Sequence, residues 1–301
     1  MTYSAEDWPL GFCAPVDTPP FDLDLPTTQT TAVVVSSPHS GAHYLPDFVA
    51  QTAPPLLALR SSEDAFVDAL LRSVPQMGAP LISAVAPRAF VDLNRSADEL
   101  DPAVVDGIRS RGANPRVAAG LGVIPRVVSE GRVIRQGKIS AEEAENRLET
   151  WYRPYHAALQ KLISETRAQF GRCLLLDCHS MPHEALIHAR APGGLLPEVV
   201  IGDRFGASCD RSIVEQVVEA FRAADFRVGL NSPFAGAFVT QHYGRPSFGQ
   251  HALQIEIDRR IYMDETRVEP LSCFDEIRQR IDRALAEVCQ AASDRALLAA
   301  E

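Results

Sequence analysis

Residues 173–182 read Cys-Leu-Leu-Leu-Asp-Cys-His-Ser-Met-Pro, an apolar run that ends in a cluster of polar residues. The run has the length and composition of a buried strand. In an open α/β sheet the carboxyl ends of the strands line the crevice that receives a ligand. His179 is therefore predicted to lie where chemistry takes place.

The same pattern occurs earlier in the chain. Residues 32–41 read Ala-Val-Val-Val-Ser-Ser-Pro-His-Ser-Gly, a second apolar run followed by a histidine, His39. One strand-end histidine is weak evidence for a metal site, but an α/β sheet can bring two such histidines together although they are distant in sequence. A catalytic zinc site commonly uses three protein ligands and one open position. The pair predicts two of the three ligands.

The rest of the chain alternates between strand and helix patterns. The other strand candidates are residues 81–86, 89–93, 122–127, 198–202, 226–230, 237–241 and 251–258, and the helix candidates are residues 63–73, 140–170, 208–224 and 272–298. This alternation predicts an α/β fold, a single-domain three-layer α/β/α arrangement with a mixed, mostly parallel sheet. Residues 1–30 are rich in proline and are expected to form an extended N-terminal arm, with residues 31–301 as a single catalytic domain.

Composition restricts the partners. The 301-residue chain has a formal net charge of −10, which argues against nucleic acid as a partner. No apolar stretch approaches the roughly 20 residues that span a bilayer, so no membrane partner is expected. The N-terminus lacks the pattern of a secretory signal. None of the six cysteines forms a C-x-x-C pair, and reduced cysteines in a cytoplasmic protein are expected.

The third ligand is expected to be a carboxylate. Residues 61–68 read Ser-Ser-Glu-Asp-Ala-Phe-Val-Asp and carry Glu63 and Asp64 at the start of a predicted helix. The alternative is that acids in a first turn only complement the helix dipole.

Two further polar positions indicate catalytic chemistry. Glu256 lies in the strand candidate 251–258, between Ile255 and Ile257, and a carboxylate in an apolar strand is costly unless it is paired or functional. Glu256 is the predicted general base, although an edge strand with an exposed polar face would also explain it.

Arg95 follows another strand candidate and can hold a carboxylate or stabilise an oxyanion, or else form a surface salt bridge. Cys178 adjoins His179 but points to the opposite face of an extended strand, so it is expected only to pack.

These motifs in this order resemble the N-formylglutamate amidohydrolase family, from about residue 30 to residue 265. The segments that carry the resemblance are 37–41 (SPHSG), Asp64 with 67–68 (VD), 92–95 (DLNR), 176–182 (LDCHSMP), 201–204 (IGDR), Asn231 with 233–236 (PFAG), 240–244 (TQHYG) and 254–259 (QIEIDR). The family looks related to zinc carboxypeptidases and aspartoacylase-type deacylases, and the resemblance implies that kind of phosphorylase/hydrolase-like fold. It also implies a zinc held by two histidines and an acid.

Carried over to this sequence, the resemblance implies His39, His179 and an acid as metal ligands. Related enzymes often place the acid three residues after the first histidine, where this chain has Ala42. The ligand must then come from elsewhere, by preference Asp64, with Glu63 as its rival. The Asn94–Arg95 pair resembles one that contacts substrate in the deacylases.

The expected reaction is hydrolysis of N-formyl-L-glutamate to L-glutamate and formate, the last step of one route of histidine breakdown. Glu256 would act as base and then protonate the leaving amine, while Arg95 stabilises the oxyanion or holds a carboxylate. The dicarboxylate substrate needs cationic side chains, and the candidate contacts are Asn94, Arg95, Arg126, His242, Tyr243, Arg245 and Arg259. Cobalt, nickel or manganese would also suit the zinc ligands.

Two alternatives remain open at this stage, and so does the oligomeric state. One is a sister amidohydrolase that acts on another N-acyl amino acid or a short peptide. The other is a non-catalytic binding protein on a hydrolase scaffold.

Overall fold

The computed structural model describes residues 18–109, 114–187 and 194–293. Most of the predicted N-terminal arm, residues 1–17, lies outside this range. Of its remainder, Phe21–Asp24 forms strand β1. None of the helices in the described ranges is long and apolar enough to cross a membrane.

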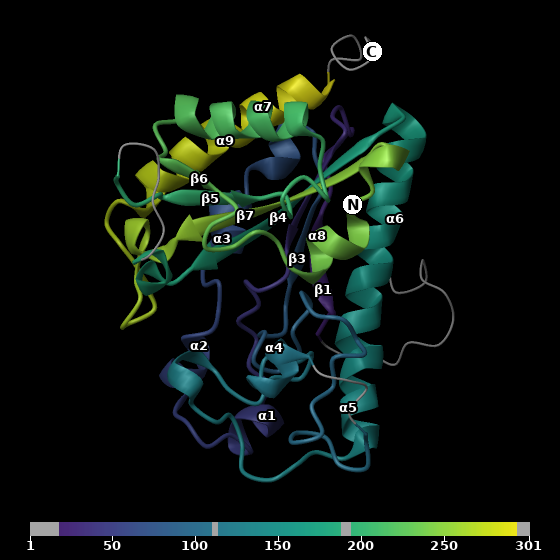
Figure 1. The fold of residues 1–301 in the computed structure, drawn as a ribbon, viewed down its shortest axis with the longest axis vertical. Helices are drawn as coiled ribbons and strands as arrows, with labels where there is room; N and C mark the ends of the chain where they lie inside the picture. The colour runs from purple at the N-terminus through teal and green to yellow at the C-terminus, as the bar shows by residue number, and fades with distance from the viewer. Residues whose placement is uncertain (1–17, 110–113, 188–193, 294–301) are drawn as a thin grey trace. The chain divides into compact units, whose positions relative to one another are not determined.

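A seven-stranded sheet has the order β1-β3-β2-β4-β7-β5-β6. Its strands are β1 (Phe21–Asp24), β2 (Val33–Ser37), β3 (Leu81–Ala84), β4 (Cys173–Met181), β5 (Val199–Gly202), β6 (Val228–Leu230) and β7 (Gln250–Asp258), and β8 (Met263–Asp264) pairs separately with β9 (Glu269–Pro270). β4 runs parallel to β2 and β7, and β6 runs parallel to β5, whereas β5 is antiparallel to β7. The prediction of an α/β fold with a mixed, mostly parallel sheet is confirmed (Figure 1).

The α-helices of the described residues follow the predicted pattern in outline. They are α1 (Pro46–Ala50), α2 (Leu56–Arg60), α3 (Val67–Leu71), α4 (Pro115–Ala118), α5 (Ala141–Arg147), α6 (Arg153–Phe170), α7 (Arg211–Ala223), α8 (Phe238–Tyr243) and α9 (Phe274–Ser293). Ser140 caps α5 by accepting a hydrogen bond from the Glu143 backbone N–H at 3.0 Å. A π-helical turn, Leu148–Tyr152, separates α5 from α6 just before Pro154, which lacks the N–H that a regular helix needs.

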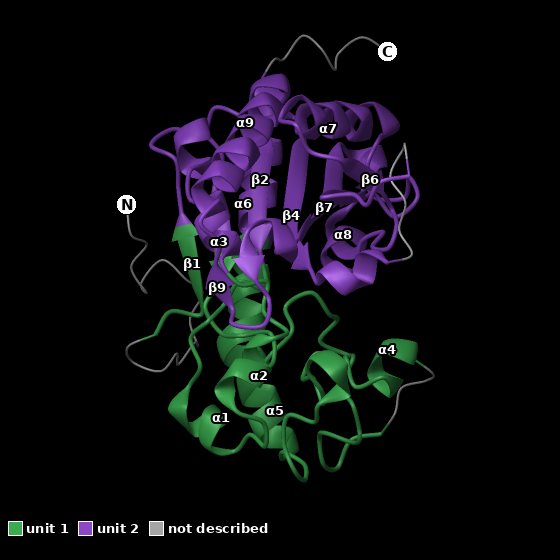
Figure 2. Cartoon of the chain, turned by 90° about the vertical axis from the view of Figure 1, so that its left-hand side faces the viewer, with its two compact units in different colours: residues 1–23, 38–65, 83–159 green, residues 24–37, 66–82, 160–301 purple. Residues whose placement is uncertain are grey.

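The chain divides into two compact units, coloured separately in Figure 2. Unit 1 comprises residues 1–23, 38–65 and 83–159, and it contains α1, α2, α4 and α5 among long irregular segments. Unit 2 comprises residues 24–37, 66–82 and 160–301 and contains most of the sheet, with α3, α7, α8 and α9. His39 belongs to unit 1, and both His179 and Glu256 belong to unit 2.

Within unit 2, helices cover both faces of the sheet. α7 and α9 lie side by side over one face of β5 and β7 (Figure 1). On the other face, Gln250 of β7 accepts a hydrogen bond from Arg167 of α6 and donates one to the Tyr243 carbonyl of α8. Since side chains alternate along a strand, Gln254 and Glu256 share the face of Gln250, toward α8.

Three strand predictions are wrong. Residues 89–93 lie in an irregular segment, although the chain there is buried and the Asp92 N–H bonds to the Val123 carbonyl at 2.8 Å. Residues 122–127 contribute only an isolated bridge, from Val127 to Val133. Residues 237–241 lie instead at the start of α8, because a short apolar run does not by itself distinguish a strand from a buried helical turn.

The helix predicted over residues 63–73 is shorter than expected. It begins only at Val67, because Phe66 has a left-handed backbone with φ 65°. Glu63 and Asp64 therefore lie before the helix, so the alternative that they complement its dipole is wrong for the observed helix.

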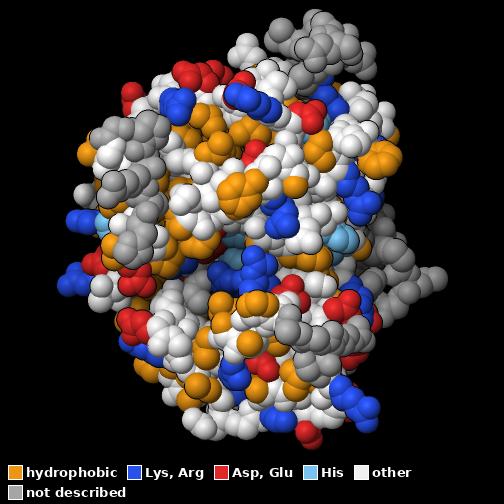
Figure 3. All heavy atoms as spheres, in the orientation of Figure 1, with side chains coloured by type: hydrophobic (Ala, Val, Ile, Leu, Met, Phe, Trp, Pro, Cys, Tyr) orange, Lys and Arg blue, Asp and Glu red, His pale blue; other side chains and the backbone are white. Residues whose placement is uncertain are grey.

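Acidic and basic side chains are interspersed over the face of the molecule that Figure 3 shows. The colours there mark described residues only. The whole sequence contains 29 basic and 39 acidic residues.

Candidate functional site

His179 lies near the carboxyl end of β4 and is held there by an aspartate on the same strand. Its Nε2 is 3.0 Å from Oδ2 of Asp177, two residues earlier and therefore on the same face. The Ser36 hydroxyl of β2 donates to Oδ1 of the same carboxylate at 2.8 Å. All three side chains are buried. The imidazole is thus oriented through Nε2, a common arrangement for histidines that bind metal through their other nitrogen.

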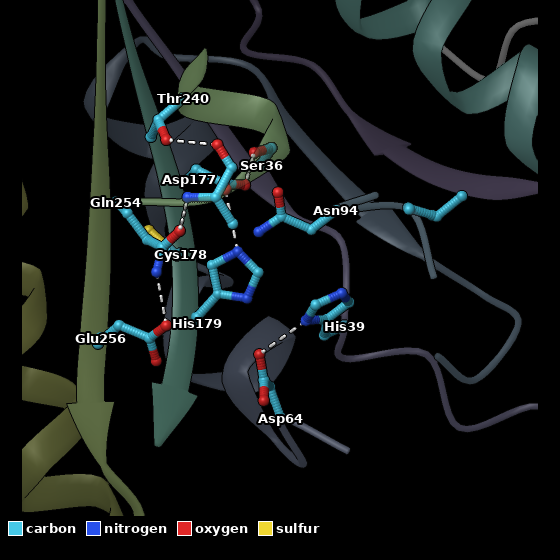
Figure 4. A network of polar contacts seen from close by, with 12 residues as sticks. Ser36, His39, Asp64, Asn94, Asp177, Cys178, His179, Thr240, Gln254 and Glu256 are labelled. Carbon is cyan, nitrogen blue, oxygen red and sulfur yellow. Dashed lines mark hydrogen bonds and ion pairs between the residues drawn. The ribbon is translucent and has the colours of Figure 1, made fainter. Parts of the chain in front are cut away.

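Glu256 lies beside His179 on the neighbouring strand. The two residues are Cα partners in the parallel pairing of β4 with β7. Figure 4 shows both side chains with Gln254, whose Nε2 donates to Oε1 of Glu256 at 2.7 Å. Glu256 is only 7% exposed, so it is a carboxylate held within the protein rather than an exposed residue of an edge strand.

His39, in unit 1, is held in a similar way. Its Nε2 is 2.7 Å from Oδ1 of Asp92, and its Nδ1 is 3.5 Å from Oδ2 of Asp64. Arg88 and the Asn94 backbone N–H donate to the Asp92 carboxylate. Burial alone would raise the pKa of Asp92, but the charges of His39, Arg88 and Arg95 outweigh it and hold that pKa well below its usual range.

The two candidate acids have different surroundings. Asp64 is tied to His39 twice, through the side-chain contact and through its backbone N–H, which donates to the His39 carbonyl at 3.0 Å. Glu63 accepts hydrogen bonds from Arg60, the shortest at 3.0 Å from Nε. Glu63 also contributes, after burial, to raising the pKa of Tyr44. The geometry of unit 1 therefore favours Asp64 as the partner of His39.

Two of the candidate substrate arginines lie in unit 1 and interact with the chain itself. Arg95 is 8% exposed and donates from Nε to the Leu121 carbonyl and from Nη1 to the Asn94 carbonyl. Burial lowers its pKa, against the charge of Asp92. Arg126 donates to the Ala118 carbonyl and lies 3.6 Å from Asp101. Each guanidinium has five N–H donors, so these contacts do not exhaust it.

Asn94 also lies in unit 1, whereas Arg245, Arg259, His242 and Tyr243 lie in unit 2. Arg259 is buried and donates to the Ser180 hydroxyl at 3.1 Å, which places it at the carboxyl end of β4. His242 and Tyr243 come from α8, and the His242 ring contacts that of Tyr243 at 4.7 Å between centroids. Burial, followed by the charge of Arg245, lowers the pKa of His242. The imidazole is therefore more readily neutral than a solvent-exposed one.

Three buried polar residues received no separate role from the sequence alone. These are Asp92, Asp177 and Gln254, each of which contacts a candidate catalytic or metal-binding side chain. A signal was present for two of them, because Asp177 and Gln254 stand two residues before His179 and Glu256 and so share a strand face with them. Asp92 contacts His39 across a sequence separation that no local pattern reveals.

Unit 2 also contains a cavity of about 240 Å³, lined mainly by apolar side chains of α7 and α9. It reaches β4 and β7 at Cys173 and His251, near the amino ends of both strands. It is therefore separate from the carboxyl ends, where His179 and Glu256 lie.

A protein-family model described as N-formylglutamate amidohydrolase matches residues 31–263. An N-formylglutamate deformylase of Pseudomonas putida is 31% identical over 266 residues, which cover 86% of this chain and 91% of that protein. The N-formylglutamate deformylase of Pseudomonas aeruginosa is also 31% identical, over 240 residues that cover 77% of this chain and 82% of that protein.

Solved structures agree with these sequence matches. The crystal structure of an N-formylglutamate amidohydrolase from Ralstonia eutropha superposes with a TM-score of 0.85 at 32% identity, covering 91% of this chain and 99% of that one. A protein of Agrobacterium tumefaciens shares the fold, with a TM-score of 0.63 at 15% identity over 90% of this chain and 94% of its own.

Proposed function

Since the chain belongs to the N-formylglutamate amidohydrolase family, we propose that it hydrolyses N-formyl-L-glutamate to L-glutamate and formate. The observation that carries the proposal is the pairing of His179 with Glu256 on adjacent strands of a sheet that matches the family fold. A buried histidine and a buried carboxylate side by side are suited to hydrolysis. The reaction would be the last step of one route of histidine breakdown.

We propose that a divalent metal ion, with zinc as the first candidate, is held by His39, Asp64 and His179. Two imidazoles and one carboxylate are a donor set that can hold a metal ion, and zinc accepts it with one position left open. The 3.5 Å between Nδ1 of His39 and Oδ2 of Asp64 supports the assignment. Neighbouring ligands of a tetrahedral zinc, each ~2.0–2.1 Å from the ion, lie about 3.3 Å apart. The same donors would also accept cobalt, nickel or manganese.

When bound, such an ion lowers the pKa of water and polarises a carbonyl group. The protein's own part in the chemistry is proton transfer and orientation. Glu256 takes a proton from the attacking water and later delivers it to the departing amine. Asp177 and Asp92 hold the two imidazoles through their Nε2 atoms.

The substrate carries two carboxylates, which the protein must hold against its own negative charge. We propose that cationic and polar side chains contact them, with Arg95 also available to the oxyanion that forms during attack. The set is Asn94, Arg95, Arg126, His242, Tyr243, Arg245 and Arg259. The burial of Arg95 and Arg259 supports the assignment, since a buried guanidinium binds a carboxylate more strongly than an exposed one.

The test is metal analysis of the purified protein together with a formate-release assay. N-formyl-glutamate should be turned over faster than N-formyl-aspartate or N-acetyl-glutamate by protein that carries about one metal per chain. Preference for another acyl amino acid would identify a sister amidohydrolase. Absence of both metal and turnover after metal supplementation would favour a binding protein and contradict the proposal.

The role of the base is tested by Glu256→Gln, which keeps the size of the side chain but not its basicity. A loss of roughly 10²- to 10⁴-fold in kcat is expected from removal of general base catalysis. A variant that retained its metal and most of its activity would contradict the assignment of Glu256.

A further inference from the structure

Gln254 is a buried amide in the middle of β7. It is 3% exposed, and its Cα partner on β4 is Asp177. It stands two residues before Glu256, so both side chains project from the same face of the strand (Figure 4). A buried amide requires partners for both of its ends.

Both ends of this amide have defined partners. Oε1 accepts a hydrogen bond from the backbone N–H of Ala237 at 3.0 Å, and Nε2 donates to Oε1 of Glu256 at 2.7 Å. A backbone N–H can only donate and an ionised carboxylate can only accept. The orientation of the Gln254 amide is therefore determined by its partners, and the amide connects the Ala237 backbone to the candidate base.

The Ala237 N–H is itself held in place by the segment before it, residues 231–236. The Asn231 side chain accepts from the Asp203 N–H at 3.0 Å and donates to the Asp203 carboxylate at 2.6 Å. The Arg204 N–H donates to the Ala235 carbonyl at 2.7 Å. A side chain at Gly202 would come within 2.6 Å of the Ala235 backbone, so the segment lies directly against the end of β5.

We infer that Gln254 is a positioning residue for the reaction, which holds the Glu256 carboxylate in the orientation needed for proton transfer. The inference rests on the proposed role of Glu256 as the base. A carboxylate at the end of a glutamate side chain can rotate, and a hydrogen bond to one oxygen fixes the direction of the other. Proton transfer needs heavy atoms within about 2.6–3.2 Å, so a rotated base is a poor one.

The alternative is that Gln254 only joins β7 to the segment before α8. Gln250 provides a matched control for that role. It lies on the same strand and the same face, is 5% exposed, and uses its amide to contact the Tyr243 carbonyl and Arg167. Within the described part of the chain, the Gln250 amide forms no hydrogen bond with Glu256.

The experiment compares Gln254→Met with Gln250→Met in the metal-loaded protein. Methionine preserves most of the volume but cannot form either hydrogen bond. Gln254→Met should lower kcat by roughly 10- to 100-fold with KM and metal content within about 3-fold of wild type, since small misplacements of a reacting group have this effect. Gln250→Met should lower the thermal midpoint and leave kcat within about 3-fold. A kcat near the wild-type value for a folded Gln254→Met would overturn the inference.

Gln254→Glu separates positioning from joining. At a pH at which both carboxyl groups are ionised, the new side chain can still accept the Ala237 N–H but cannot donate to Glu256, and it places a like charge beside the base. Positioning predicts that Gln254→Glu lowers kcat at least as much as Gln254→Met. If Gln254 only joined β7 to the segment before α8, Gln254→Met would lower kcat more than Gln254→Glu, because only the methionine loses the bond to Ala237. That result would overturn the inference.

A double-mutant cycle ties the effect to Glu256. Adding Gln254→Met to Glu256→Gln should lower the residual rate by less than about 2-fold, since residues that act as a unit are non-additive. A full additive loss would show that Gln254 acts independently of Glu256. An inactive Glu256→Gln with a fully active Gln254→Met overturns only the positioning role, whereas an active Glu256→Gln overturns both that role and the proposed base.

Discussion

His179 of β4 and Glu256 of β7 are direct Cα partners in a parallel pairing that runs the full length of both strands. Partners in adjacent strands project to the same face, so the register alone brings the imidazole and the carboxylate together. A shift of the register by one residue would send one of them to the opposite face. The nine-residue buried strands therefore fix the relation between the two groups before any loop contributes.

The two acids that precede α3 should differ in their effect on metal binding. Asp64→Asn is expected to weaken metal affinity by roughly 100-fold or more, because the loss of a ligand should exceed the 10- to 100-fold loss seen for outer partners. Glu63→Gln, the adjacent control, removes the ion pair with Arg60 but should keep the metal. Metal content after dialysis against a graded chelator measures both. Equal loss in the two variants would contradict the choice of Asp64.

Asp177 should act on metal binding through His179. Asp177→Asn removes the charged partner of Nε2 and is expected to weaken metal affinity by roughly 10- to 100-fold. Ser36→Ala is the control, because it removes one hydrogen bond to Asp177 and leaves the aspartate–histidine contact in place. That control should cost about 1 kcal/mol of stability. Wild-type metal affinity in a folded Asp177→Asn would rule out the positioning role of Asp177.

Cys178 should be chemically inert in the folded protein. Its side chain is buried, and burial, followed by the charge of Asp177, raises the pKa of the thiol. The thiolate is the reactive form, so a raised pKa leaves the residue as a neutral thiol at neutral and mildly alkaline pH. Alkylation of the native protein at pH 8 should leave Cys178 unmodified by mass spectrometry, and Cys178→Ala should keep kcat within about 3-fold. Rapid loss of activity that maps to Cys178 would refute this.

The sheet could be predicted from the sequence where strands are long and buried. β2 and β4 begin as apolar runs, whereas β7 alternates polar and apolar residues. Each of the three strands begins within two residues of the position that the sequence pattern predicts. The short elements could not be predicted. Residues 237–241 are too few for periodicity to decide, and α8 begins there after Gly236, whose φ is 113°. The position of β5 between β7 and β6 depends on long-range pairing that no local pattern contains.

The candidate site shows the same division. His39 and His179 could be selected as candidates because a histidine after an apolar strand pattern is conspicuous. Glu256 could be selected because a carboxylate between Ile255 and Ile257 is costly unless it is paired or functional. The family resemblance only favoured Asp64 over Glu63, because the local structure that separates them depends on the left-handed Phe66 and on a backbone hydrogen bond from Asp64 to His39. Both features arise from tertiary packing and not from helix propensity.

Arg259 should contribute to substrate affinity more than to the rate of the chemical step. Its guanidinium is buried at the carboxyl end of β4, where its Nε donates a hydrogen bond to the Ser180 hydroxyl. Arg259→Met should raise KM for N-formyl-glutamate by roughly 10- to 100-fold, since a charge-assisted hydrogen bond to a carboxylate is worth about 1.5–3 kcal/mol. Arg260→Met is the neighbouring control, because Arg260 contacts His183, and its KM should change by less than about 3-fold.

The substrate carboxylate that Arg259 holds can be identified with N-formyl-glutamine, which lacks the side-chain carboxylate but keeps the α-carboxylate. If Arg259 binds the side-chain carboxylate, Arg259→Met should raise KM for N-formyl-glutamate and leave that for N-formyl-glutamine nearly unchanged. An equal rise for both substrates would assign Arg259 to the α-carboxylate. Unchanged KM values for both, in a folded variant, would exclude Arg259 from the substrate contacts, because a guanidinium that bound either carboxylate could not be removed without cost.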